Sequence, residues 1–250
     1  MRNAAGLTLL TTLFAVSGAA QSGHNLERPG HWKTRYDDGT TASERRFVVM
    51  RPGWHVFAGP GGLFWDPGSY ASGNYSVSST IFLFPEGDPE QSGSTRLDSP
   101  FGLFLGGSDL EVDGARYVAF ELRNDRHFRI AEHTGGKTHD LVPWTAHDAV
   151  VTSGADTTGP VRNLLAVDVR GDRTVFYLND QAIAELPGDR VALDGLIGVR
   201  AGAGLSIHVT EVDIGPNRRD ESRIRPSPTD HYSVRKATMG SARAARRAGT

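Results

Sequence analysis

The chain has 250 residues, of which 38% are hydrophobic, 30 are glycine, 13 are proline and none is cysteine, and its formal net charge is −2 at pH 7. A chain without cysteine has no disulfide, no thiolate metal ligand and no site for lipid attachment at a cysteine. The length fits one large domain, and the glycine and proline content favours short strands joined by tight turns over long helices.

Residues 1–20 have the pattern of a secretory signal peptide. They contain the early Arg2, no acidic residue, an apolar run from Leu7 to Val16, and small residues up to Ala20, where we expect cleavage. Such a segment is too short to span a bilayer comfortably, and no later segment is long and apolar enough to do so. The sequence therefore predicts a secreted or periplasmic protein, most simply a bacterial one, with no membrane insertion.

Residues 21–45 form a polar N-terminal segment without a regular pattern, and the predicted strands follow it at 46–51, 54–57 and 63–65. The clearest alternation in the chain comes next. Tyr75, Val77, Ile81 and Leu83 are apolar, whereas the residues at 76, 78 and 80 are polar. This period of two indicates a strand with one face in the core.

The rest of the body continues as short strands joined by turn residues. Asn124-Asp125, Gly171-Asp172 and Asn179-Asp180 each join two strands through a connection short enough for an antiparallel hairpin. No amphipathic helix stands out. The further predicted strands are 101–105, 116–123, 126–133, 163–170, 173–179, 181–186, 195–200 and 205–214. Because one open sheet of so many strands would curl or split, the prediction is an all-β, two-sheet antiparallel sandwich over residues 46–215.

Four segments carry a family resemblance. They are PWT at 143–145, NLLAVDVRG at 163–171, VFYLNDQAIA at 175–184 and GLIGV at 195–199. Their order resembles the C-terminal half of concanavalin A-like jelly-roll domains, the fold of many lectins and glucanases. More narrowly, it is similar to the secreted bacterial 3-keto-disaccharide hydrolase domain family.

The resemblance covers residues 46–215 and concerns the spacing of hairpins more than chemistry. It implies a jelly-roll sandwich and, as an activity, cleavage of a glycosidic bond. One departure is the turn at Asn179-Asp180, where the family has Asn-Gly. Aspartate is tolerated there because it also adopts positive φ.

The stretch between Asp109 and Gly114 resembles the start of a calcium loop. Asp109, Glu111, Asp113 and Gly114 match positions 1, 3, 5 and 6 of an EF-hand, but position 12 is Phe120 and the flanking segments are strands. An EF-hand is therefore not expected. A looser calcium site at Asp109, Glu111 and Asp113 and a plain acidic rim loop both remain open.

An acid pair near the end of the body suggests catalysis. Glu211 and Asp213 resemble the Glu-x-Asp-x-Glu strand of laminarinase-like β-glucanases, whose acids serve as nucleophile and general acid. Gly215 stands in place of the third acid. The alternative is two acids on the solvent face of a closing strand, which we favour.

Three histidines invite a metal interpretation. His127 and His133 share one face of a predicted strand, but six residues of extended chain place them about 20 Å apart. A single zinc ion would need further ligands besides His139. The sequence does not by itself predict a zinc site, and no nucleophile elbow is present.

Tryptophan residues beside turns point to sugar binding. The C–H face of a pyranose packs on an indole ring, while Asn, Asp and Arg side chains bond its hydroxyl groups. The competing interpretation is core or edge packing for each tryptophan. The candidate ligand-binding residues are Trp54, Trp65, Asp109, Arg123, Trp144 and Asn163.

Residues 216–250 form a basic tail. Between 217 and 250 there are nine Lys or Arg residues and three acidic residues. A basic tail is one signal of nucleic-acid binding, but this one has almost no apolar periodicity and no aromatic residue except Tyr232. Solvated disorder is therefore expected, and no nucleic-acid partner is predicted.

The leading prediction is a secreted domain that binds a glycan or a cell-surface polysaccharide without cleaving it. The first alternative is a glycoside-cleaving enzyme, which rests on the family resemblance alone. The second alternative is a structural or protein-interaction domain without a ligand. No cofactor other than calcium is suggested.

Overall fold

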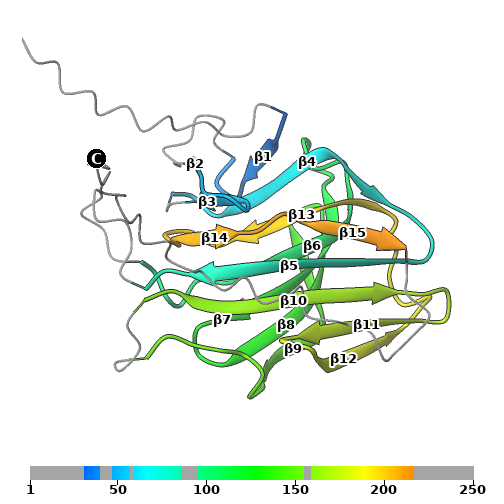
Figure 1. The fold of residues 1–250 in the computed structure, drawn as a ribbon. Coiled ribbons are helices and arrows are strands. Elements are labelled where there is room, and N and C mark those ends of the chain that lie inside the picture. Colours follow the sequence, from blue (N-terminus) through cyan, green and yellow to red (C-terminus); the bar gives the residue numbers. More distant parts are fainter. Residues whose placement is uncertain (1–30, 40–46, 57–58, 86–94, 155–158, 217–250) are drawn as a thin grey trace, which may run out of the picture. The chain divides into compact units, whose positions relative to one another are not determined.

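The computed structural model describes residues 31–39, 47–56, 59–85, 95–154 and 159–216 (Figure 1). The predicted signal peptide and the predicted tail beyond residue 216 lie outside these ranges. The described residues contain only strands, turns and loops, and so no helix that would be long and apolar enough to cross a membrane.

Two antiparallel sheets pack face to face and confirm the predicted all-β jelly-roll sandwich (Figure 1). In spatial order, the seven-stranded sheet contains β1 (Lys33–Tyr36), β4 (Gly62–Ala71), β13 (Gly195–Ala201), β6 (Phe101–Ser108), β7 (Arg116–Arg123), β8 (His127–Thr134) and β9 (Lys137–Ala146).

The second sheet has eight strands. In spatial order it contains β12 (Gln181–Pro187), β11 (Arg173–Leu178), β10 (Val161–Val169), β5 (Tyr75–Leu83), β14 (Ile207–Val209), β3 (Trp54–Val56) and β2 (Phe47–Val49), while β15 (Asp213–Pro216) also pairs with β5. Strand β5 thus has two successive partners on one side, β15 at its start and β14 at its end.

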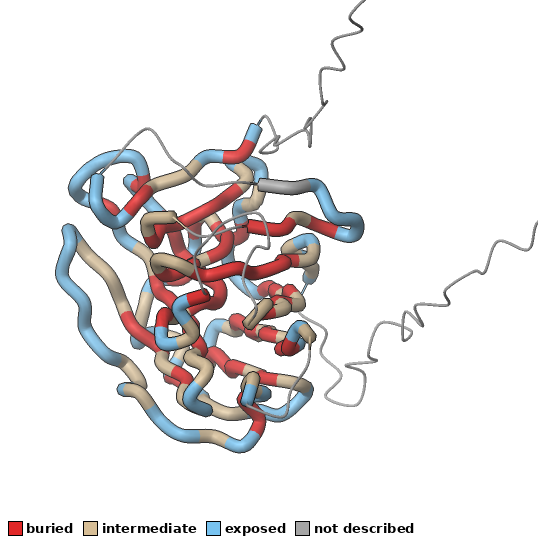
Figure 2. Tube along the Cα trace, turned by 90° about the vertical axis from the view of Figure 1, so that its left-hand side faces the viewer, coloured by how far each residue is buried: buried red, intermediate tan, exposed pale blue. Residues whose placement is uncertain are grey.

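The core lies between the sheets, where Figure 2 shows the buried residues gathered. On β5, Tyr75, Val77, Ile81 and Leu83 are buried and the residues between them at 76, 78, 80 and 82 are only partly buried, as the alternation predicts. Strand β10 contributes alternate residues in the same way. Burial of this face at roughly 25 cal/mol per Å² is the main force that closes the sandwich.

A second, smaller apolar cluster covers the other side of the seven-stranded sheet, which we call the outer face. Leu63, Trp65 and Phe104 pack there against Leu110 and Ala115. The loop 109–115 therefore folds back over the sheet with Leu110 as its anchor.

The sandwich begins earlier than the sequence analysis predicted. Strand β1 lies inside the segment 21–45 and pairs with β4. Tyr36 of this strand and Trp32 just before it are buried in the core. The prediction was wrong here because Trp32 and Tyr36, four positions apart, are the only apolar residues of this stretch. They do not give the period of two that indicates a strand. Strand β9 was also missed, since its residues are mostly exposed and Pro143 interrupts the pattern.

The turn at Asn179-Asp180 adopts the expected conformation. The φ angles are 49° at Asn179 and 68° at Asp180, so both central residues take the left-handed conformation of a tight hairpin turn. The Asn179 side chain accepts a hydrogen bond from the Leu164 N–H at 2.8 Å and donates one to the Ala149 carbonyl at 2.8 Å. The turn is thereby fixed to two neighbouring segments.

A row of charged residues crosses the outer face. Arg200 on β13 lies opposite Gly102 on β6, which lies opposite Glu121 on β7, which lies opposite Arg129 on β8. The Glu121 side chain is 1% exposed and accepts bonds from Arg129 Nη2 at 2.6 Å and Nε at 3.1 Å, and Arg200 Nε lies 3.5 Å from its other oxygen. Because Gly102 has no side chain, Arg200 and Glu121 can meet across β6.

The Gly102→Ala substitution is expected to lower the free energy of unfolding by about 1–3 kcal/mol, the usual cost of overpacking. A Cβ at this position would collide with the Phe120 carbonyl and press on Glu121. Gly114→Ala is the matched control, because a Cβ there meets nothing within 4 Å. Equal denaturation midpoints for the two variants in urea would contradict the role assigned to Gly102.

Candidate functional site

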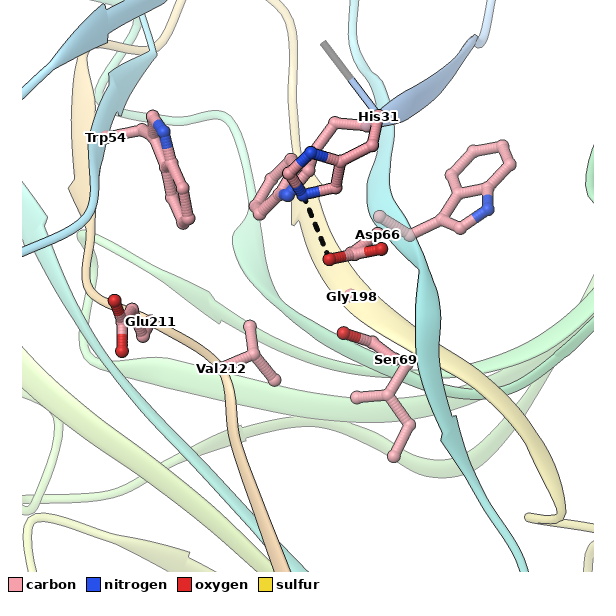
Figure 3. A pocket seen from close by; sticks show the side chains of 10 residues that line it. His31, Trp54, Asp66, Ser69, Gly198, Glu211 and Val212 are labelled. Atoms are coloured by element: carbon pink, nitrogen blue, oxygen red, sulfur yellow. Dashed lines mark ion pairs between the residues drawn. The ribbon is translucent and has the colours of Figure 1, made fainter. Parts of the chain in front are cut away.

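A cleft of about 300 Å³ opens at the edge of the sandwich, between β4 and β13 of one sheet and the segment that joins β14 to β15 of the other (Figure 3). It is lined by His31, Trp32, Trp54, Trp65, Asp66, Ser69, Ile197, Gly198, Glu211 and Val212. Its lining residues come from five separate parts of the chain.

A bulge in β4 turns Asp66 and Ser69 toward the cleft. Trp65 pairs with Gly198 and Tyr70 pairs with Leu196, so residues 66–69 lie opposite Ile197 alone. The Asp66 carboxylate accepts a hydrogen bond from the Gly68 N–H at 2.8 Å, which closes the bulge as an Asx turn. Extra residues at such an irregularity re-aim side chains out of the regular ladder.

An interruption in the opposite sheet supplies Glu211 and Val212. Thr210 replaces a normal ladder pair: its N–H donates to the Thr80 carbonyl at 2.9 Å and its hydroxyl accepts from the Thr80 N–H at 2.9 Å. The two following residues line the cleft before β15 resumes pairing at Asp213. Glu211 is exposed.

Two indole rings form the aromatic wall. The centroids of Trp32 and Trp54 lie 4.6 Å apart with 51° between the ring planes. Trp32 is 6% exposed and belongs to the core, whereas Trp54 is only partly buried. The buried ring thus fixes the orientation of the ring that faces the cleft.

The charged groups of the cleft are mainly acidic. His31 Nε2 lies 3.1 Å from Asp66 Oδ2, and the side chains are 64% and 34% exposed (Figure 3). Glu211 lies on the opposite side of the cleft from Asp66 (Figure 3). Among the described residues, neither lysine nor arginine lines the cleft.

A second cavity, of about 280 Å³, lies at the end of the sandwich where the hairpin turns at Gly73 and Gly171 meet the loop before β13. None of the described residues that line it is aromatic. The edge cleft is therefore the better candidate, since ligand sites combine aromatic or apolar walls with a few convergent polar groups.

The structure places only one of the predicted ligand-binding residues, Trp54, with an exposed part of its ring in the cleft. The Trp65 side chain is 1% exposed and packs in the outer-face cluster, edge to face with Phe104 at 6.4 Å. The prediction of Trp65 as a stacking platform was wrong, because its place in the alternation of β4 directs it into that cluster.

Arg123 and Trp144 do come together, but on the outer face. The Arg123 guanidinium carbon lies 4.2 Å from the Trp144 ring centroid, and that of Arg129 lies 4.7 Å from it. Arg123 is also paired with Asp125 at 2.7 Å. These contacts occupy both residues with protein partners, and neither residue lines the cleft, so their role in ligand binding stays a prediction.

Asn163 serves the fold. Its side chain is fully buried, its carbonyl accepts bonds from the Val151 N–H at 3.0 Å and from Asn179 at 3.0 Å, and its amide donates to the Val151 carbonyl at 2.9 Å. With these bonds made and no exposed surface, Asn163 cannot reach a ligand. This part of the prediction was wrong.

The predicted calcium residues do not converge. Asp109, Glu111 and Asp113 are exposed, and Glu111 pairs with Lys33 at 2.6 Å. Across the described ranges, no group of three or more His, Cys, Asp or Glu side chains could hold a metal ion. The calcium prediction at this loop is corrected. Leu110 anchors the loop in the outer-face cluster, Lys33 of β1 engages Glu111, and Arg35 of β1 donates to the Leu110 and Val112 carbonyls.

The remaining candidate acids and histidines lie at separate places in the structure. Glu211 and Asp213 are both exposed, as expected for the solvent face. His127 pairs with Asp125 at 3.1 Å, and His139 is exposed on β9. His133 stacks on Tyr117 with centroids 4.4 Å apart and 9° between the planes.

The sequence analysis missed His31, Trp32, Asp66 and Ser69. Trp32 was the available signal, since a large aromatic residue within a polar segment needs a buried partner. Asp66 and Ser69 gave no such signal, because Asp-Pro-Gly-Ser reads as an ordinary turn.

No family model matches the chain, and no curated protein matches it either. Among solved structures, the carbohydrate binding module CBM66 from Bacillus subtilis is similar with a TM-score of 0.51 and 11% identity, covering 74% of this chain and 95% of the module. A Bacteroides ovatus mixed-linkage glucan GH16 in complex with a product has a TM-score of 0.50 and 8% identity, covering 76% and 97%.

The exoplasmic/lumenal domain of VIP36 in a Ca²⁺- and Man3GlcNAc-bound form has a TM-score of 0.50 and 11% identity, covering 79% of this chain and 90% of that domain. Likeness at such low identity concerns the fold alone. It confirms the concanavalin A-like jelly roll. The narrower resemblance to the 3-keto-disaccharide hydrolase family is not confirmed.

Lowering the pH from about 6.5 to about 4 is expected to destabilise the protein through His133. Burial lowers the pKa of His133 to about 4 from its ordinary value near 6.5. In that interval the unfolded chain binds a proton that the folded chain refuses, so the free energy of unfolding falls as the pH falls. His133→Phe, which keeps the ring stacked on Tyr117, should reduce this loss by about 2 kcal/mol in denaturation curves at pH 7 and pH 4.

His139→Phe, at an exposed position of β9, is the control and should leave the pH dependence unchanged. If wild type and His133→Phe lose the same stability between the two pH values, the burial of a neutral His133 is disproved.

Proposed function

We propose that this domain binds a glycan in the edge cleft formed by Trp54, Asp66, Ser69 and Glu211. The observation that carries the proposal is the pairing of a partly exposed indole with carboxylates from both sheets in one cleft of about 300 Å³. This volume is at the lower end of the range for small-molecule sites and suits a single sugar ring.

In the proposed complex, the C–H face of the sugar packs on Trp54. Burial of that face and of the ring is favourable and needs no hydrogen bond. The hydroxyl groups around the ring then donate to the Asp66 and Glu211 carboxylates and exchange a hydrogen bond with the Ser69 hydroxyl. Because Trp32 and the Gly68 N–H hold Trp54 and Asp66 in place, little side-chain entropy is lost on binding.

The structural comparisons support this proposal at the level of the fold. The similar structures include a carbohydrate binding module, a mixed-linkage glucan protein with a bound product, and a domain bound to Man3GlcNAc. A shared fold does not imply a shared function, so the argument for glycan binding rests on the cleft.

Glycoside cleavage is the second candidate. It is favoured by the origin of the two carboxylates, Asp66 from the seven-stranded sheet and Glu211 from the eight-stranded sheet, on opposite sides of one cleft. A glycosidase needs two carboxyl groups flanking the scissile bond, one as acid and one as base or nucleophile. A structural or protein-interaction role is the third candidate and requires no ligand in the cleft.

Export is also proposed, from the composition of residues 1–20. We expect the mature protein recovered from a secreting bacterial host to begin near Gln21, as measured by N-terminal sequencing. A protein that keeps Met1 and stays inside the cell would contradict the proposed secreted or periplasmic location.

Trp54→Ala is expected to weaken glycan binding at least about tenfold, or about 1.4 kcal/mol, because the stacking surface is lost. Wild type is first tested on a panel of neutral polysaccharides (laminarin, cellulose, xylan, mannan and levan), and affinity for the ones that bind is then measured by calorimetry. Trp144→Ala, the same change at a tryptophan outside the cleft, is the control and should bind like wild type.

If folded wild-type protein binds neither a polysaccharide of the panel nor an amino-sugar oligomer, glycan binding is refuted. The structural or protein-interaction role would then remain. Equal affinity of wild type and Trp54→Ala for the glycan would show that the glycan binds outside the edge cleft. New reducing ends that appear with wild type and not with Glu211→Gln would establish cleavage over binding alone.

A further inference from the structure

The charge of the cleft is unbalanced. Asp66 and Glu211 are both carboxylates, and the only basic group that lines the cleft within the described ranges is the His31 imidazole. His31 contacts Asp66 at 3.1 Å and does not offset Glu211. Whatever binds here meets at least one carboxylate that no cation of the described residues neutralises.

Glu211 is the carboxylate in question. It is exposed, and the described residues give its carboxylate neither an ion pair nor a hydrogen bond. A neutral sugar would use this group only as a hydrogen-bond acceptor. A ligand with a positive charge would gain an ion pair in addition, in a cleft that shields it partly from solvent.

The aromatic wall of the cleft also favours a positively charged ligand. The face of an indole carries negative potential and attracts a cation within about 6 Å of the ring centroid. On the outer face of this protein, Trp144 has two guanidinium groups at 4.2 and 4.7 Å from its centroid. Trp54 and Glu211 line the same cleft, so a cation from a ligand can take the corresponding place against the Trp54 ring there (Figure 3).

The net charge of residues 1–216 also favours a cationic ligand. The whole chain has a net charge of −2, while residues 217–250 contain nine basic and three acidic residues, which leaves −8 on the rest. An acidic body raises the local concentration of cationic ligands and speeds their approach.

We propose that the glycan bound in this cleft is an amino sugar with a free, protonated amino group. The inference rests on the proposed function and narrows it to a ligand class. In the complex, the pyranose ring packs on Trp54, the ammonium group lies between the Trp54 face and the Glu211 carboxylate, and Asp66 and Ser69 bind hydroxyl groups.

Three matched oligosaccharides test the inference. The β-1,4-linked hexamers of glucosamine, N-acetylglucosamine and glucose share one backbone and differ only in an ammonium, acetamide or hydroxyl group at C2. We expect the glucosamine hexamer to bind wild type at least about tenfold more tightly than the glucose hexamer in calorimetry at low salt, as an ion pair combined with a cation–π contact allows.

The Glu211→Gln substitution removes the charge and keeps the shape of the side chain. It should reduce the preference for the glucosamine hexamer over the glucose hexamer to about twofold or less. Asp213→Asn is the matched control, since Asp213 is an exposed acid two residues away that does not line the cleft. Its preference should stay at the wild-type value.

Two results would overturn the inference. One is a wild type that binds a neutral glycan of the panel and shows no preference for the glucosamine hexamer. This result would support glycan binding and refute the proposal that the ligand is an amino sugar. The other is a preference that persists in Glu211→Gln, which would mean nonspecific attraction of a polycation to the acidic body. Absence of binding to every glycan, neutral or amino, would instead refute the proposed function itself.

Discussion

A buried carboxylate organises the seven-stranded sheet. Glu121 is 1% exposed and is held between Arg129 and Arg200, which come from strands on either side of it. A lone carboxylate at this depth would be strongly unfavourable, so the two guanidinium groups have to be in place when the sheet closes. Their meeting requires the glycine at 102 and a register in which β13, β6, β7 and β8 put these residues in one row. The register of four strands is thus tied to one ion pair network.

The same register sets the edge where the cleft lies. Strand β13 continues from Arg200 to Gly198 and Ile197, and there β4 departs from regular pairing through its bulge. The bulge has a fixed place because the ladder on both sides of it is regular. The cleft therefore follows from two irregularities, one in each sheet, that stand opposite one another. Regular strands at this edge would bring the sheets together and leave no cleft.

The fold was largely predictable because its signals are local. The alternation in β5 and the Asn179-Asp180 turn can each be read from neighbouring residues. Strand β1 could not be read in this way, since Lys33 and Arg35 are explained only by a loop some 75 residues later in the chain that they hold in place. The resemblance to concanavalin A-like domains was confirmed at the level of the fold, and it carried no information on which tryptophan faces solvent.

The site was hardly predictable, because residue type does not determine what a side chain contacts. Of the four tryptophans, Trp65 packs in the outer-face cluster, Trp144 contacts two arginines, Trp32 supports a neighbour and Trp54 alone is partly free in the cleft. The acids of the loop 109–114 match a metal-binding spacing, yet they are exposed. The residue of the loop that contributes to the fold is Leu110, which packs in the outer-face cluster. A ligand in the edge cleft would contact Asp66 in one sheet and Glu211 in the other. It would thus connect the two sheets non-covalently at the open side of the sandwich. Opening of that side would then require release of the ligand, so occupancy and resistance to local unfolding and proteolysis would be thermodynamically linked.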